Sequence, residues 1–440
     1  MDRLATRIDG ASLAVFRIAF GIIGLVSAVR LVAHGWATTR YAGPSLRFTY
    51  FGFDWVPKPS EGAMLALLGV VAVAAVLVAA GCWYRPAIVA FFVGFTWIEL
   101  IDVTTYLNHY WFVSLAALLL CFLPADACLS VDAWRRGERT VPRGAVYLLR
   151  AQIAVVYAFA GLAKLNADWL WRALPLRLWL PARDGLGPLD GLLDERWFAH
   201  ALAVGGALFD CALVPLLLWR RTRPFAFAAV VVFHLATWRL FAIGVFPWLM
   251  IAGATLFFAP DWPRRLSALR PRHPLADPPP VRPVLARLAV VAGVAWMVVQ
   301  VAIPLRHHLY PGDARWTDEG YRFSWNVLAA ERSGDVEFRL TDPATGRTWI
   351  DDASALYTSE QWRLMATEPD LIHQAALELA RRARAEGHDR VEVRADAFMS
   401  LNGRPAARLV DPTVDLAAQP RDLWHDDWIL PAPRTPPPEP

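Results

Sequence analysis

The sequence predicts an all-α polytopic membrane bundle of about nine helices, followed by a small α+β extramembrane domain. Three observations support this fold class. Of the 440 residues, 56% are hydrophobic and only 19% are charged, whereas an ordinary soluble domain is about one quarter charged. The mean hydropathy is +0.33. Long apolar runs fill the first 305 residues, and the share of charged residues rises after that point.

Nine apolar runs approach the length of about 20 residues that a helix needs to cross a bilayer. They are 13–33, 63–81, 86–104, 108–124, 144–163, 198–218, 224–240, 241–259 and 288–305. The seventh and eighth runs can alternatively form one broken or re-entrant unit. We therefore assign the membrane bundle to residues 1–305.

The distribution of arginine predicts the orientation in the membrane. Arginines cluster in the loops at 135–143, 220–223 and 264–287, and short loops rich in Lys and Arg stay in the cytoplasm. The N-terminus is therefore expected in the cytoplasm, and an odd number of spans places residue 306 onward outside it. The formal net charge of +4 is too small to indicate binding to nucleic acid.

Residues 306–430 are predicted to form the extracytoplasmic α+β domain. Residues 335–350 alternate as a hairpin with a turn at 342–346, and 390–411 form two strands around Asn402-Gly403, which favours a tight turn. Between them, 360–386 is expected to be one amphipathic helix. Residues 431–440 form a Pro-rich tail.

Ionisable residues inside apolar runs are candidates for function, because a charge in hydrocarbon is costly. Lys164 ends the fifth run. Its side chain can snorkel, with the ammonium in water, or it can be desolvated so that a neutral amine serves as a base. Asp168, four residues on, can pair with it. Asp210 lies well inside the sixth run and must be protonated or paired; a polar contact between helices is the simpler role.

Two histidines also lie at or within the runs. His109 opens the fourth run on the same outer side as Lys164, and His234 lies inside the seventh. Each can be a hydrogen-bonded structural histidine, but together with Lys164 they are expected to line one cavity in the outer half of the bundle. Zincin, P-loop, GxSxG and Rossmann motifs do not occur, and the histidines are too scattered to indicate a metal site. This pattern favours an enzyme whose lipophilic co-substrate enters from the bilayer.

Eight segments, in the same order along the chain, resemble the vitamin K-dependent γ-glutamyl carboxylases, whose membrane part is the horizontally transferred transmembrane domain. The segment Arg150–Trp169 is the longest. The others are 11–17, 81–86, 104–111, 233–248, 259–263, 320–328 and 411–415. The composition, rich in Arg and Ala, is typical of a bacterial homologue.

The resemblance implies a reaction. Members of this family oxidise a vitamin K hydroquinone with O2 to the epoxide, and the strong base made on the way removes the γ-proton of a glutamate, to which CO2 adds. The co-substrates implied are vitamin K hydroquinone or menaquinol, O2 and CO2, with no metal. The implied partners are a quinone from the membrane and a glutamate-containing peptide or protein, with no nucleic acid.

The resemblance also implies roles for residues. Lys164 matches the lysine proposed to deprotonate the hydroquinone, and His109 matches a histidine tied to the same step. Asn108 and His234 are the corresponding candidates for binding the quinone. Tyr321 and Trp325 belong to the segment 321–328, which matches the region implicated in glutamate binding.

Three hypotheses for function follow. The first is a γ-carboxylase homologue. The second is a membrane quinol oxidase or epoxidase that carboxylates no protein. The third is a non-enzymatic protein that binds a lipid or a partner. The first two require Lys164 at a pocket open to lipid, whereas the third predicts that Lys164 snorkels. The family's disulfide to the outer domain cannot form here, because no Cys follows Cys211.

Overall fold

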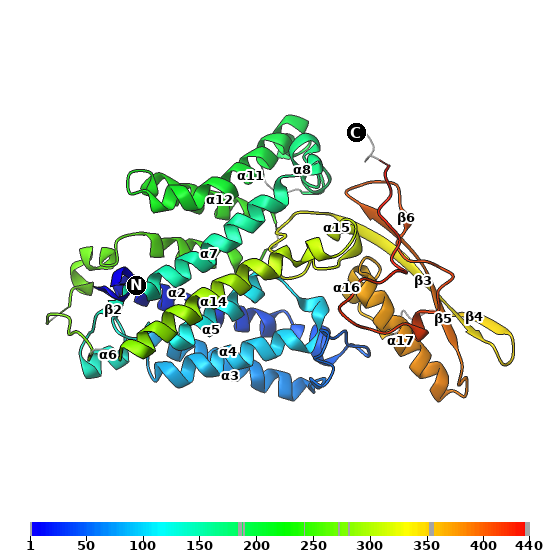
Figure 1. The fold of residues 1–440 in the computed structure, drawn as a ribbon, viewed down its shortest axis with the longest axis horizontal. Helices are drawn as coiled ribbons and strands as arrows, with labels where there is room; N and C mark the ends of the chain where they lie inside the picture. The colour runs from blue at the N-terminus through cyan, green and yellow to red at the C-terminus, as the bar shows by residue number, and fades with distance from the viewer. Residues whose placement is uncertain are drawn as a thin grey trace.

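The computed structural model describes residues 2–183, 187, 190–241, 243–271, 273–279, 282–351 and 356–435. Long helices form one end of the molecule, and a four-stranded sheet with two helices forms the other (Figure 1). The predicted fold class is therefore confirmed. Of the predicted Pro-rich tail, residues 431–435 have no regular secondary structure, and 436–440 lie outside the described residues.

Each of the nine predicted membrane runs contains a helix. These helices are α2 (Ala11–Ala33), α3 (Glu61–Ala80), α4 (Tyr84–Ile101), α5 (Asn108–Phe122), α7 (Arg143–Lys164), α11 (Arg196–Leu218), α12 (Arg223–Leu240), α13 (Phe246–Ala254) and α14 (Pro283–Leu305). Among the described residues, six are long and apolar enough to cross a membrane, namely α2, α3, α4, α7, α11 and α14. The chain is an integral membrane protein.

The helix in the eighth run is short. Helix α13 has only nine residues before a 3-10 turn at Thr255–Phe257, so it extends about 14 Å and is too short to span a bilayer alone. It packs against α12. The proline at position 247, in the first turn of α13, suits a helix start because its missing N–H has no partner there in any case.

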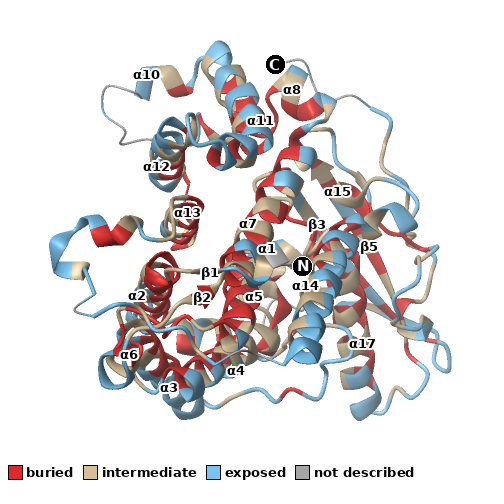
Figure 2. Ribbon diagram, turned by 60° about the vertical axis from the view of Figure 1, so that its left-hand side comes forward, coloured by how far each residue is buried: buried red, intermediate tan, exposed pale blue. Residues whose placement is uncertain are grey.

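Burial follows the environment that each helix faces (Figure 2). Helix α3 exposes Val70, Val73 and Val76, as expected where lipid replaces water. Among the residues of α14, only Gln300 and Pro304 are buried. Gln300 accepts a hydrogen bond from Gln152 Nε2 of α7 at 3.1 Å. Such polar contacts between helices help to hold α14 on the bundle where the hydrophobic effect cannot.

Short elements complete the membrane half. They are α1 (Asp2–Ala5), β1 (Arg7–Ile8), α6 (Val131–Arg136), β2 (Val141–Pro142), α8 (Ala167–Arg172), α9 (Leu176–Trp179) and α10 (Asp190–Leu193). Strands β1 and β2 pair antiparallel beside the N-terminus.

The second half of the structure is an antiparallel sheet with strand order β4-β3-β5-β6, preceded by the short helix α15 (Ala314–Thr317). The strands are β3 (Arg332–Asp342), β4 (Arg347–Asp351), β5 (Glu392–Leu401) and β6 (Ala407–Arg408). Both predicted hairpins form. At the second, Asn402 and Gly403 have φ values of 53° and 74°, which Asn and Gly tolerate better than other residues.

The helix predicted at 360–386 is wrong in one respect, because two helices stand in its place. They are α16 (Ser359–Met365) and α17 (Pro369–Ala385). Proline disfavours helical backbone in the residue before it, and Glu368 accordingly has extended backbone. The break lets α17 lay Leu371, Ile372 and Leu379 on the sheet, while α16 turns toward the membrane half.

A buried contact joins the two halves. Asp102 follows α4 and is 2% exposed. Its Oδ2 accepts a hydrogen bond from Gln361 Nε2 of α16 at 2.9 Å, and the same amide donates to Leu46 O at 3.0 Å. Gln361 also completes a capping box with Thr358, so a residue in the first turn of α16 both stabilises the helix start and anchors the helix to the membrane half.

The predicted orientation leads to a topological experiment. If the arginine-rich loops at 135–143, 220–223 and 264–287 are cytoplasmic, a reporter fused after Leu305 is expected to be active when it requires export. A matched fusion within residues 135–143 serves as the cytoplasmic control. Activity of a cytoplasm-only reporter after Leu305 would contradict the orientation.

Candidate functional site

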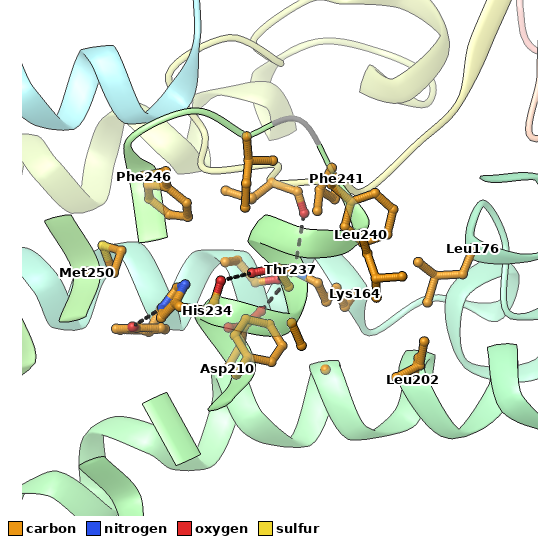
Figure 3. A pocket seen from close by; sticks show the side chains of 18 of the residues that line it. Lys164, Leu176, Leu202, Asp210, His234, Thr237, Leu240, Phe241, Phe246 and Met250 are labelled. Carbon is orange, nitrogen blue, oxygen red and sulfur yellow. Dashed lines mark hydrogen bonds and ion pairs between the residues drawn. The ribbon is translucent and has the colours of Figure 1, made fainter. Parts of the chain in front are cut away.

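An apolar cavity of about 110 Å³ lies among α7, α11, α12, α13 and the segment 327–328 (Figure 3). Its walls are mainly Leu, Phe, Met and Val side chains. The polar groups on the lining are few, and they belong to Tyr157, Lys164, Asp210, His234 and Thr237. A concave apolar site with a small number of placed polar groups is typical of small-molecule binding.

Lys164 lies at the end of α7, and its side chain points into this cavity. Helix α7 ends there because Asn166 starts α8, its Oδ1 accepting the N–H of Trp169 at 3.1 Å. Lys164 is 5% exposed. The interpretation as a snorkelling lysine is therefore wrong, since the ammonium is enclosed by protein.

Asp210 is the partner of Lys164. The distance from Lys164 Nζ to Asp210 Oδ2 is 2.9 Å, and Nζ also donates to Ala160 O at 3.1 Å and Val327 O at 3.3 Å. The pairing with Asp168 suggested by sequence proximity is not formed. The close approach of α7 and α11 depends on Gly161, where a Cβ atom would lie 2.7 Å from Cys211 Sγ.

His234 lies on α12, at the other polar position of the cavity. Its Nε2 is 2.8 Å from the hydroxyl of Tyr157 on α7. Its Nδ1 is buried and has no hydrogen-bond partner among the described residues. A buried polar atom without a partner is costly. This ring nitrogen is therefore available to a ligand in the cavity.

His109 and Asn108 lie behind one wall of the cavity and do not line it. The ring of Phe246 stands between the two histidines, its centroid 5.9 Å from that of His109 and 5.8 Å from that of His234. Asn108 Oδ1 accepts a hydrogen bond from the Tyr106 hydroxyl at 2.9 Å. The structure thus brings Lys164 and His234 to one cavity and leaves His109 adjacent to it.

The segment 321–328 connects the α+β half with Tyr106 and Lys164. Its Phe323 N–H donates to the Tyr106 hydroxyl at 3.0 Å, and its Val327 carbonyl accepts from Lys164. Phe323, Trp325 and Leu328 have φ values of 63°, 58° and 55°. Backbone strain of this kind persists only where surrounding contacts enforce it, and it is common at functional sites.

The two residues expected to bind glutamate do not line the cavity. Trp325 is 1% exposed and its ring packs against Phe112. Tyr321 is half-buried beneath the guanidinium of Arg332, 4.7 Å from the ring centroid. Their neighbours Val327 and Leu328 form the wall instead.

Asp168 connects the site to the α+β half. It is 3% exposed and accepts hydrogen bonds from Arg404 at 2.9 Å and from Asn402 Nδ2 at 3.0 Å. Burial alone raises the pKa of this carboxyl, but the hydrogen bonds from Arg404 and Asn402 outweigh it and lower the pKa to about 2. The carboxylate therefore stays ionised at neutral pH. Because Asp168 lies only four residues beyond Lys164, its contacts fix α8 beside the cavity.

The hydrogen bonds of Asp168 predict that the stability of the fold falls in acid. Because the pKa falls from 3.8 to about 2 on folding, Asp168 stabilises the fold by about 2 kcal/mol above pH 5, and this stabilisation disappears as the pH falls toward 2. Asp168→Asn should lower the free energy of unfolding by at least this amount at pH 7 and progressively less below pH 4, measured by thermal melting in detergent. Asp396→Asn, which breaks an exposed pair with Arg408, is the control and should have little effect. Equal effects of the two variants would contradict the prediction.

Sequence reasoning missed Tyr157. The signal was present, because Tyr157 precedes Lys164 by seven residues, and residues two helical turns apart share a face. The sequence also indicated that Asp210 is a buried acid. It gave no indication that the partner of Asp210 is Lys164, 46 residues earlier.

The fold and this site define a multi-pass membrane protein with an apolar cavity among its helices and an adjoining α+β half. Two family models match the chain. The HTTM domain matches residues 6–262, and the lumenal domain of vitamin K-dependent gamma-carboxylase matches residues 285–435. The chain belongs to the vitamin K-dependent γ-carboxylase family. No solved structure is significantly similar to it.

Proposed function

We propose that this protein oxidises a vitamin K hydroquinone, or menaquinol, to the epoxide with O2 and couples this oxidation to the addition of CO2 to glutamate in a peptide or protein. The observation that carries the proposal is the cavity in which a buried amine and an unpartnered histidine nitrogen border an otherwise apolar space. A hydroquinone has the matching chemistry, with apolar rings and two hydroxyl groups.

Each polar residue has a role that its chemistry permits. Lys164 accepts the proton of one hydroxyl, a group as weakly acidic as a phenol, with a pKa near 10. His234 Nδ1 hydrogen-bonds a quinol oxygen, and the Tyr157 hydroxyl fixes the orientation of the ring. The apolar wall excludes water, which protects a strong base from protons. When hydroquinone is bound, its reaction with O2 would supply the strong base that removes the γ-proton of glutamate.

His109 and Asn108 act on the same site from outside its wall. His109 contacts Phe246 through its ring, so it sets the position of an aromatic side chain that the quinone touches. Asn108 connects through Tyr106 to the segment 321–328. We assign that segment, with Tyr321 and Trp325, to the approach of the glutamate substrate, because it passes from the outer half to Lys164.

The test is incubation of purified protein with reduced vitamin K, bicarbonate and a Glu-rich peptide, with epoxide and carboxylated peptide measured separately. Formation of both products is expected, and a parallel reaction with menaquinol identifies the quinone. Epoxide without carboxylated peptide would favour a quinol epoxidase. Formation of neither product by protein that binds neither quinone would overturn the proposal.

A further inference from the structure

All three hydrogens of the Lys164 ammonium already have acceptors. They point to Asp210 Oδ2 at 2.9 Å, Ala160 O at 3.1 Å and Val327 O at 3.3 Å. An ammonium group has three donors and no lone pair. Lys164 must therefore lose a proton before it can accept one from a hydroquinone.

The nearest acceptor for that proton is the carboxylate of Asp210. The side chains of Lys164 and Asp210 are only 7% and 6% exposed. Burial disfavours both charges, so an uncharged pair of amine and carboxylic acid competes with the ion pair. Transfer along the 2.9 Å hydrogen bond changes no net charge and needs no movement of heavy atoms.

We infer that Asp210 holds the proton that Lys164 gives up, so that the neutral amine can take the proton of the hydroquinone hydroxyl. This inference rests on the proposed function. In the step, the O–H bond of the hydroquinone breaks and its electron pair stays on oxygen, while the lone pair of Nζ forms a new N–H bond. Asp210 keeps its proton, so the new ammonium faces the new quinol anion. Asp210 acts through Lys164 and is a positioning residue.

Among the described residues, the other titratable groups around the pair form contacts of their own and are not placed to replace Asp210. On α7 and α12, Tyr157 and His234 hydrogen-bond each other. On α11, Cys211 packs beside Gly161. In α8, Asp168 is bound by Arg404. The segment 326–328 contributes a carbonyl oxygen and no titratable side chain.

The pH dependence of quinol epoxidation tests the inference, because the two possible roles of Asp210 predict shifts of opposite sign. If the pair shares one proton, wild-type kcat/KM is flat through neutral pH and falls only where the pair takes up a second proton. Asp210→Asn then leaves a lone lysine, which must lose its own proton. In this variant, the fall of kcat/KM on the acid side of the pH profile should move to higher pH. The maximal rate should fall by about 10²-fold.

If Asp210 were only a structural counter-charge, its removal would destabilise the ammonium and move the acid limb to lower pH, which would overturn the inference. Asp210→Glu, which retains an acid, should keep the wild-type shape at a reduced rate. Should Asp210→Asn fail to fold, infrared difference spectra of wild-type protein on anaerobic addition of hydroquinone supply the second test. A protonated aspartic acid is expected in the hydroquinone-bound state, and only a carboxylate there would overturn the inference.

Failure of the inference and failure of the proposed function can be told apart. If wild-type protein forms no epoxide, the proposed function is wrong. If Lys164→Met epoxidises quinol at the wild-type rate, quinol epoxidation stands, but Lys164 is not the base and the inference falls with it. If Lys164→Met is inactive but Asp210→Asn has a wild-type pH profile, the lysine works without Asp210 and only the inference is wrong.

Discussion

Lys164→Ala is expected to lower both epoxide formation and carboxylation by about 10⁴-fold, the upper range for a positioned acid–base group. Lys164 is buried and is the only lysine among the described residues that line the cavity, so no other amine can replace it. Initial rates of epoxide formation at saturating quinol give the measurement. A small exogenous amine should restore part of the activity, because the missing function is proton acceptance at a vacant position.

Two further substitutions sharpen this prediction. Lys164→Arg should not restore turnover, since a guanidinium stays protonated. Lys164→Met keeps the volume of the side chain and lets Asp210 take a proton, which limits the cost of breaking a buried ion pair. It should be as inactive as Lys164→Ala while still binding quinone. Full epoxidation by Lys164→Arg would mean that the lysine acts as a fixed charge.

The chain supplies its own control for lysine chemistry. Lys58 is the only other lysine in the sequence, and its Nζ donates to Pro44 O at 2.6 Å, away from the cavity. Lys58→Met should leave quinol turnover unchanged. A loss of activity in this variant equal to that in Lys164→Met would point to a general effect of lysine removal on the fold.

His234→Phe is expected to slow quinol oxidation by about 10²–10³-fold, as the loss of a placed hydrogen-bonding group does. Phenylalanine keeps the contacts of the ring with Phe209, Phe233 and Phe246 but has no nitrogen for the quinol oxygen. Tyr157→Phe should cost about tenfold, because it removes one hydrogen bond that orients the histidine. Both effects are measured as kcat and KM for the quinol.

The control for His234 is His200 on α11, whose ring bonds to the backbone carbonyls of Arg196 and Trp171 outside the cavity. His200→Phe should not change quinol kinetics. If His234→Phe has wild-type kcat and KM, His234 does not bind the quinol. His109, behind Phe246, is then the remaining histidine candidate.

Local patterns in the sequence were sufficient to predict most elements. Apolar length located all nine helices, because hydrocarbon admits few backbone arrangements other than a helix. Alternation and the pair Asn402-Gly403 located the two hairpins. The helix over 360–386 was too long, since the effect of Pro369 on the backbone of Glu368 was not weighed against a continuous amphipathic pattern.

From the amino-acid sequence alone it follows that this chain is a membrane bundle with a further α+β part and that Lys164, Asp210 and His234 are ionisable groups in apolar surroundings. These are properties of composition and of periodicity within one helix. The folded structure was needed to show that Lys164 pairs with Asp210 rather than Asp168. It was also needed to show that His234 faces the cavity while His109 stands behind Phe246. Such pairings depend on how closely helices far apart in the sequence approach, here through Gly161, and local pattern carries no information about that distance.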